Sequence, residues 1–260
     1  MAPVVPHIIK FDSIASTNTT LRALVNTGVP EGTVVVAKSQ TSGRGRGDRV
    51  WSSPEGGLYF SLLLKAPQLN RPTDLALLAG AVMAKTVKQF VSSSQSVGVK
   101  WPNDCLLQGK KVGGVLCEAL GEGCTAPLII GVGINVNVAS THLIPFQERP
   151  FKATSLLEFS SGQRFDLDLV LQTFLKIFFE KYETYLQRGF GFIQSFWEGE
   201  CLFLGKQIEL KNTGVPQEKM SPTGSIRGTF LGIDEQGAIV VSDGQGQRLR
   251  FVTGELICCW

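Results

Sequence analysis

One stripe of large apolar side chains most constrains what this chain can fold into. It lies within residues 166–186 and consists of Val170, Phe174, Phe178, Tyr182 and Tyr185. Its members recur at three- and four-residue intervals, the spacing of one helix face. Asp166 or Asp168 is placed to cap the start of this helix. We expect the stripe to lie in the core, because such a face is strongly disfavoured in water.

Strand-like apolar runs dominate the sequence before this helix. The predicted strands are residues 8–11, 32–37, 58–64, 97–101, 111–118 and 128–138. The turn expected between the strands at 97–101 and 111–118 lies at residues 108–109. Residues 74–91 carry apolar positions at helical spacing without an internal proline, which suits a helix that covers a sheet. A shorter helix follows the capping residues 13–18 and ends near Gly28. We therefore predict an α+β fold in which helices back a mixed β-sheet.

The pattern changes after Gly189. Short strand-like runs at residues 202–210, 224–232, 237–243 and 247–252 are separated by turn residues, which predicts a small β-barrel. Residues 212–216 (NTGVP) are expected to form an exposed turn. With 260 residues and 28.2 kDa, the chain can hold one large and one small domain. We place the large domain at residues 1–195 and the small one at residues 200–260.

Composition argues against several classes of protein. The net charge of +3 is too small to indicate nucleic-acid binding by itself. The N-terminal segment lacks the features of a secretory signal, and the longest apolar run, residues 75–84, is shorter than the ~20 residues that span a bilayer. We expect an ordered cytoplasmic protein that is not inserted in a membrane.

The cysteines favour free thiols over a zinc site. They form no C-x-x-C pair, and only two histidines accompany them. The six cysteines are Cys105, Cys117, Cys124, Cys201, Cys258 and Cys259. We expect them to be reduced and buried.

Residues 40–49 (QTSGRGRGDR) form a loop in which glycine and arginine alternate. The glycines let backbone N–H groups turn toward a ligand, and Arg44, Arg46 and Arg49 add three guanidinium groups. Such a loop is suited to anions. A solvated arginine loop or an RG-type RNA contact explains the same composition, so these interpretations stay open here. The loop lacks the G-K-[ST] of a Walker motif and is not an ordinary P-loop.

Two further segments carry polar or small residues at strand ends or inside strands. Residues 100–104 (KWPND) gather a lysine, an amide and a carboxylate around a proline turn, and strand ends are common places for active sites. The alternative is that Trp101 lies in the core, Asp104 caps a turn and Lys100 lies on the surface. Gly131 and Gly133 sit inside a β-branched run, which often marks the close approach of a ligand.

Five segments, taken in order, resemble the site segments of biotin protein ligases. They are residues 16–18 (STN), 43–46 (GRGR) and 100–104 (KWPND), Lys111 ahead of two glycines, and residues 131–135 (GVGIN). The resemblance extends over most of the chain. It implies a catalytic domain of the class II synthetase and biotin ligase type, followed by a small SH3-like barrel.

The resemblance also implies a reaction. Such an enzyme joins the carboxylate of biotin to the α-phosphate of ATP, releases pyrophosphate and leaves biotinyl-5'-AMP. It then transfers biotin to a specific lysine of a biotin carboxyl carrier protein or domain. Two anions meet in the first step, and Arg44, Arg46 and Lys111 would offset their repulsion, so that loss of one typically slows the reaction ~10²-fold. Mg²⁺ should accompany ATP, although no carboxylate cluster in the sequence indicates a metal site.

Site residues follow from the same resemblance. The catalytic residues are Arg46, Lys111 and Asp104. The biotin-binding residues are Ser16, Thr17, Asn18, Gln40, Gly43, Arg44, Gly45, Arg46, Lys111, Gly114, Gly131 and Gly133. The nucleotide-binding residues are Arg44, Arg46, Trp51, Lys100, Asn103, Lys111 and Asn135.

Individual roles are expected as follows. Ser16, Thr17 and Gln40 bind the ureido end of biotin, with Asn18 orienting them. Gly114, Gly131 and Gly133 leave room for the valeryl chain. Trp51 packs beside the arginine loop, and Asn135 meets the adenine edge. Asp104 hydrogen-bonds or helps deprotonate the acceptor lysine. The neighbouring Cys105 has no histidine partner near it in sequence and is expected to be inert.

The sequence departs from its relatives in two places. Asp48 stands where many of them carry a basic residue. The catalytic pattern also begins almost at the first residue, so we expect no helix-turn-helix domain and no DNA partner. The carrier domain of acetyl-CoA carboxylase is the expected acceptor, and a homodimer is compatible with the resemblance.

Two rival functions remain at this point. A lipoate ligase shares the adenylation chemistry and a related fold. A non-enzymatic RNA-binding module would account for the RG loop and the small barrel, although residues 202–260 offer few aromatics for base stacking.

Overall fold

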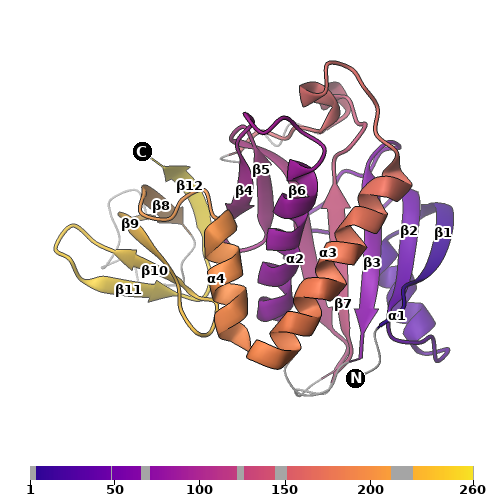
Figure 1. The fold of residues 1–260 in the computed structure, drawn as a ribbon, viewed down its shortest axis with the longest axis horizontal. Helices are drawn as coiled ribbons and strands as arrows, with labels where there is room; N and C mark the ends of the chain where they lie inside the picture. The colour runs from indigo at the N-terminus through magenta and orange to yellow at the C-terminus, as the bar shows by residue number, and fades with distance from the viewer. Residues whose placement is uncertain are drawn as a thin grey trace.

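The structure is a computed structural model that describes residues 4–47, 49–65, 71–121, 126–143, 151–211 and 225–259. Asp48, Cys124 and the turn expected at residues 212–216 lie outside the described residues, as do the side chains of Cys258 and Cys259. A large β-sheet with helices on both faces makes up most of the molecule, and a smaller C-terminal sheet stands beside it (Figure 1).

Seven strands form the large sheet. They are β1 (His7–Ile14), β2 (Thr33–Gln40), β3 (Leu58–Leu64), β4 (Val97–Lys100), β5 (Asp104–Leu107), β6 (Lys110–Ala119) and β7 (Leu128–Ile134). The strand order is β1-β2-β3-β7-β6-β5-β4. Strands β1 and β2 run parallel, and the other neighbours run antiparallel. The predicted mixed sheet is therefore confirmed.

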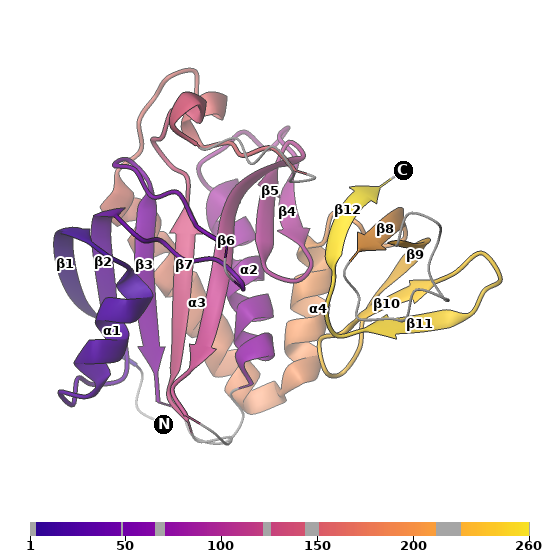
Figure 2. The same ribbon diagram turned by 180° about the vertical axis from the view of Figure 1, so that it is seen from behind.

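Helices cover both faces of this sheet. Helices α2 (Pro72–Lys88) and α3 (Leu167–Arg188) lie on one face (Figure 1), and α1 (Thr17–Val25) lies on the other (Figure 2). The aromatic stripe of α3 is buried as predicted, and the Asp166 carboxylate caps the helix by accepting from the Asp168 N–H at 2.8 Å. Two short 3₁₀ turns, at Ser140–His142 and Leu157–Phe159, lie on the connection between β7 and α3. None of the helices in the described part of the chain is both long and apolar enough to cross a membrane.

The sequence reasoning missed strand β5 and helix α4 (Phe190–Glu200), and in the C-terminal sheet it missed strand β12 (Glu255–Cys259). Strand β5 pairs with both β4 and β6, so the turn at Gln108 and Gly109 joins β5 to β6 and does not lie between β4 and β6 directly. Its four residues follow a proline turn and are too few to show a period. Helix α4 begins directly after Gly189, which ends α3. Two glycines and several aromatic residues give α4 a weak helix propensity, and it is stabilised by packing of the buried Trp197.

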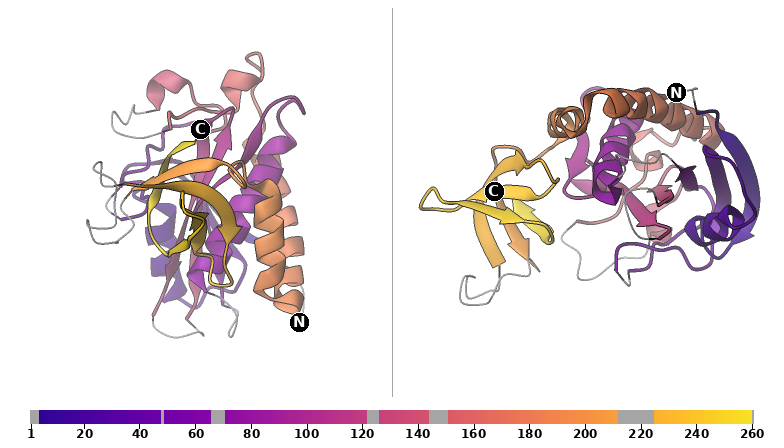
Figure 3. Two further views of the ribbon diagram at one scale, coloured as in Figure 1. Left: turned by 90° about the vertical axis from the view of Figure 1, so that its left-hand side faces the viewer. Right: turned by 90° about the horizontal axis from the view of Figure 1, so that it is seen from below.

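The C-terminal sheet has five strands. They are β8 (Gln207–Lys211), β9 (Ser225–Ile233), β10 (Ile239–Ser242), β11 (Arg248–Phe251) and β12 (Glu255–Cys259). The order is β11-β10-β9-β8-β12, so within the described strands the sheet does not close on itself, although it is consistent with an SH3-like fold. Figure 3 shows this sheet beside the end of the large sheet and α4. The buried indole N–H of Trp101 donates to the Gly237 carbonyl at 3.0 Å and ties the two sheets together. The division at residues 195–200 remains a prediction.

The described cysteines are free thiols, as predicted. Cys105 is fully buried, while Cys117 and Cys201 are half-buried. Burial raises the pKa of all three thiols above its ordinary value, and for Cys201 to about 12. They are therefore protonated at neutral pH and poor nucleophiles.

Replacing Phe174 with alanine should lower the free energy of unfolding by about 3–5 kcal/mol, because it leaves a cavity in the core. The side chain is fully buried on α3, and its ring meets Phe60 of β3 edge-on with 5.1 Å between centroids. Urea unfolding followed by tryptophan fluorescence measures the loss. Leu169 on the same helix is 52% exposed and serves as the control. Its alanine variant should change stability by less than about 0.5 kcal/mol, and equal losses would contradict this placement of α3.

Candidate active site

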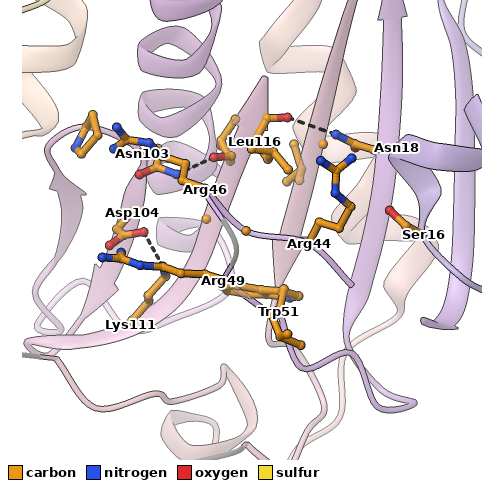
Figure 4. A pocket seen from close by; sticks show the side chains of 18 of the residues that line it. Ser16, Asn18, Arg44, Arg46, Arg49, Trp51, Asn103, Asp104, Lys111 and Leu116 are labelled. Carbon is orange, nitrogen blue, oxygen red and sulfur yellow. Dashed lines mark hydrogen bonds and ion pairs between the residues drawn. The ribbon is translucent and has the colours of Figure 1, made fainter. Parts of the chain in front are cut away.

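One pocket gathers most of the predicted site residues. It lies where the arginine loop crosses β7 toward β6, on the face of the sheet that carries α1 (Figures 2 and 4). The predicted residues that line it are Ser16, Thr17, Asn18, Gln40, Arg44, Gly45, Arg46, Trp51, Lys100, Asn103, Asp104, Lys111, Gly114, Gly131 and Gly133. Segments that lie far apart in the chain therefore meet at one place, which is the arrangement that the resemblance implied.

A chain of hydrogen bonds occupies the α1 end of the pocket. Gln40 Oε1 accepts from the Thr17 N–H at 2.8 Å, and Gln40 Nε2 donates to Ser53 Oγ at 2.8 Å. Ser61 of β3 lies behind them, with its Oγ 2.7 Å from Thr17 Oγ1 and 2.5 Å from Asn18 Oδ1. Ser16 is the N-cap residue of α1 but makes no side-chain cap hydrogen bond, so its buried hydroxyl is available to a ligand. This end of the pocket therefore suits a neutral polar group.

Two lysines flank one carboxylate at the other end. Asp104 accepts from Lys100 Nζ at 2.8 Å through Oδ2 and forms an ion pair with Lys111 through Oδ1. The Lys100 side chain is only 4% exposed, so the alternative that placed it on the surface is wrong. Burial by itself would raise the pKa of Asp104, but the charges and hydrogen bonds of the two lysines outweigh it and hold that pKa well below its ordinary value.

This low pKa bears on the expected role of Asp104. A general base works best when its pKa lies near the operating pH, and a carboxylate held by two lysines is far below it. The geometry instead suits Asp104 to fixing the ammonium groups of Lys100 and Lys111. Its action on an acceptor lysine remains a prediction.

The three arginines of the loop differ in their partners. Arg44 forms an ion pair with Glu118 at 3.0 Å, and Arg49 forms one with Glu255 at 2.6 Å. Arg46 makes no ion pair with any residue that the structure describes, and it lines both this pocket and an adjoining cavity next to the C-terminal sheet. Of the three, Arg46 is therefore the guanidinium best placed to meet an incoming anion.

Glycines in the sheet make room for side chains of the protein itself. A Cβ on Gly133 would lie 2.7 Å from the indole nitrogen of Trp51, and one on Gly131 would collide with Asn18. Trp51 in turn packs over Lys111, whose Nζ is 5.2 Å from the ring centroid. These positions must therefore be glycine for Trp51 and Asn18 to pack against the sheet. The expected space for a valeryl chain remains a prediction.

Two predicted residues do not line the pocket. Gly43 packs against the Trp51 carbonyl and the Ser53 side chain, where a Cβ would collide. Asn135 is buried behind the pocket, and its Nδ2 donates to the Thr154 carbonyl at 2.9 Å. Its Oδ1 has no hydrogen-bond partner among the described residues. The expected contact of Asn135 with adenine remains a prediction.

Three functional candidates were missed by the sequence reasoning. Glu118 lies on β6 at a two-residue spacing from Gly114 and Leu116, both of which line the pocket. Because alternate residues of a strand share a face, this spacing could have identified it. Ser61 and Glu255 have no such local signal, since they come from β3 and from the start of β12 in the other sheet.

Sequence comparisons find similar proteins over most of the chain. Residues 10–135 match the Biotin/lipoate A/B protein ligase family, and residues 219–257 match the Biotin protein ligase C terminal domain. The bifunctional ligase/repressor BirA of Bacillus spizizenii is 36% identical over 243 residues, which is 92% of this chain and 70% of that protein. A biotin–[acetyl-CoA-carboxylase] ligase of Paracoccus denitrificans is 29% identical over 83% of this chain and 86% of that protein.

A solved structure is similar to this chain over nearly its whole length. The biotin protein ligase of Aquifex aeolicus, in complex with biotin and ATP, superposes with a TM-score of 0.77 at 31% identity, over 97% of this chain and 98% of that one. The agreement covers both sheets. The chain therefore belongs to the biotin protein ligases of the biotin/lipoate A/B protein ligase family.

Proposed function

We infer that this chain is an ATP-dependent biotin–protein ligase, which converts biotin and ATP to biotinyl-5'-AMP and transfers biotin to a lysine of a carrier protein. The observation that carries the residue assignments is that Arg46 and Lys111 line one pocket whose other end offers neutral polar groups. Biotin has this same division, with a polar ureido ring at one end and a carboxylate at the other. A relative and a solved structure that are named for biotin favour it over lipoate.

In the adenylation step, a carboxylate oxygen of biotin attacks the α-phosphorus of ATP. A new oxygen–phosphorus bond forms, the bond to the β-phosphate breaks, and pyrophosphate leaves. Lys100, Lys111 and Asp104 together carry one net positive charge, and Arg46 adds another beside them. These fixed charges offset the repulsion between the two anions and stabilise charge that develops on the phosphoryl oxygens.

In the transfer step, the neutral amine of the acceptor lysine attacks the carbonyl carbon of the adenylate, and AMP leaves. The amine must first lose a proton. Asp104 is our proposed hydrogen-bond acceptor for this lysine, although its low pKa suits orientation better than proton removal. Trp51 over Lys111 and the loop above them help to keep water from the anhydride.

The biotin half of the site is proposed on the α1 side. Thr17 and Gln40, held together by two hydrogen bonds, would pair with the ureido group, and Ser16 would add a free hydroxyl. Buried ureido groups need such partners, because an unpaired polar group in a dry pocket is costly.

No protein site for Mg²⁺ is found among the residues that the structure describes. Among the described residues, no three His, Cys, Asp or Glu side chains come together as ligands for a metal ion. Of the carboxylates that line the pocket, Asp104 is held by lysines and Glu255 by Arg49. The described residues therefore do not fit a protein-bound metal, and an ion that arrives with ATP would be held by phosphates and water.

Several further expectations remain proposals. The carrier domain of acetyl-CoA carboxylase is the proposed acceptor, in line with the name of the Paracoccus denitrificans relative. A cytoplasmic location and a homodimer stay predictions.

The function is tested by labelling. The full chain, incubated with biotin, Mg-ATP and a biotin carboxyl carrier domain, should raise the mass of the carrier by one biotinyl group, as measured by mass spectrometry. Omission of ATP should abolish the product, and replacement of biotin by lipoate should reduce it strongly. Unlabelled carrier in the presence of well-folded chain would refute the ligase, and faster labelling with lipoate would favour the lipoate ligase.

Arg46→Ala and Lys111→Ala should each slow biotinyl-5'-AMP formation by ~10²-fold or more, because each removes a fixed charge from the meeting point of two anions. Pyrophosphate release measures the rate, and circular dichroism checks the fold. Lys38→Ala is the control, since that lysine is 69% exposed and pairs with Asp12 away from the pocket. Normal rates in both site variants would overturn these assignments.

The low pKa of Asp104 predicts a pH dependence of stability. Below about pH 4, the ordinary pKa of aspartate, the unfolded chain binds a proton at this position and the folded protein does not. The wild type should therefore lose stability relative to Asp104→Asn as pH falls from 6 to 3. Urea unfolding of both proteins across this range measures the difference. A difference that stays constant or moves in the other direction would contradict the depressed pKa.

A further inference from the structure

Glu118 ends the hydrogen-bond chain that runs behind the biotin half of the site. It lies on β6 with a side chain that is 15% exposed, and it does not line the pocket. Its carboxylate accepts from Asn18 Nδ2 at 2.7 Å and pairs with Arg44 at 3.0 Å. Arg22 of α1 approaches the same carboxylate from outside at 3.3 Å. This mostly buried carboxylate therefore connects α1 to the start of the arginine loop.

The carboxylate fixes the amide of Asn18. A carboxylate only accepts hydrogen bonds, so the amide must turn its NH₂ toward Glu118 and its oxygen toward Ser61. The single proton of the Ser61 hydroxyl is then drawn to that amide oxygen, 2.5 Å away, because the amide oxygen can only accept. Ser61 Oγ also lies 2.7 Å from Thr17 Oγ1, the hydroxyl that donates to Gln40 Oε1 at 3.2 Å. The charge on Glu118 thus sets the orientation of the Asn18 amide, and Asn18 lines the pocket.

The same carboxylate holds Arg44. In Figure 4 the Arg44 side chain points toward Asn18 and away from Lys111. Its guanidinium pairs with Glu118 and is therefore directed away from a phosphate that Lys111 would bind. The Arg44 side chain is 46% exposed, and an ion pair of this kind is weak enough to open and close. The Arg44–Glu118 ion pair can therefore act as a latch, by which we mean a reversible contact that holds the start of the loop against β6.

We propose that Glu118 is a positioning residue that fixes Asn18 beside the biotin half of the site and latches the arginine loop through Arg44. The proposal deepens the ligase function and rests on it. Arg44 is then a loop anchor, and Arg46 is the loop arginine that meets the substrates. The orientation of Asn18 and the contact that holds Arg44 therefore depend on one carboxylate.

The Glu118→Gln variant tests this proposal at nearly constant size. Glutamine can donate as well as accept, so Asn18 loses its fixed orientation and Arg44 loses its counter-charge. We expect the KM for biotin to rise ~10-fold, as for the loss of one charge-assisted hydrogen bond, while the KM for ATP changes less than about twofold. Trypsin should also cleave the ligand-free loop after Arg46 or Arg49 several times faster than in the wild type, because the latch is open.

Two further variants sharpen the result. Arg22 pairs with the same carboxylate but does not line the pocket, so Arg22→Gln serves as the control. It should leave the KM for biotin and the cleavage rate unchanged within about twofold. Arg44→Gln should speed cleavage after Arg46, and combining it with Glu118→Gln should speed cleavage no further, since the two residues act through one contact. Arg44→Gln carries the test by itself if Glu118→Gln fails to fold.

Contrary outcomes are distinct. Wild-type cleavage in both variants with an unchanged KM for biotin would overturn the proposal, and so would equal rises in both KM values with a lower Tm, which indicate a merely structural role. Cleavage is measured without substrates, so it judges the latch even if the wild type fails to label a carrier. That failure would count against the ligase function.

Discussion

The site depends on one carboxylate held between two ammonium groups. Lys100 is almost fully buried, and such a charge is stable only with a partner of opposite sign. Asp104 supplies that partner and holds Lys111 at the same time. Because three strands end or begin at this point, β4, β5 and β6, the cluster also fixes the hairpins that carry it. The result is a positive charge whose position is set before any substrate arrives, which is the condition for effective electrostatic stabilisation.

The arginine loop is held in relation to this cluster by carboxylates from two other places. Glu118 on β6 pairs with its first arginine, and Glu255 at the start of β12 pairs with its last. Arg46, between them, lines the pocket. The C-terminal sheet therefore takes part in the site, because Glu255 lines the pocket and also holds Arg49. The hydrogen bond from Trp101 to the Gly237 carbonyl keeps this sheet against the large one.

Much of the fold could be predicted from local patterns. The stripe on α3 and most strands of the large sheet follow from the spacing of apolar residues, and the cap of α3 is Asp166, one of the two residues expected there. Strand β5 was missed because four residues after a proline show no period. Helix α4 was missed because its glycines and aromatics have weak helix propensity, so that packing of Trp197 decides its conformation. Local signals fail where tertiary contacts outweigh propensity.

The sequence by itself determined which side chains are present and on which strands, loops or helix ends they stand, because strand and helix periods are local. Through the resemblance of its motifs to a known family, it also implied that Arg46 and Lys111 share one site. Only the tertiary structure decided which loop arginines are already paired, since Arg44 meets Glu118 across 74 positions and Arg49 meets Glu255 across 206. It likewise decided that Lys100 is buried and that Asp104 is held as a carboxylate. Such contacts leave no local period, because they arise only when sheets, loop and helix pack together.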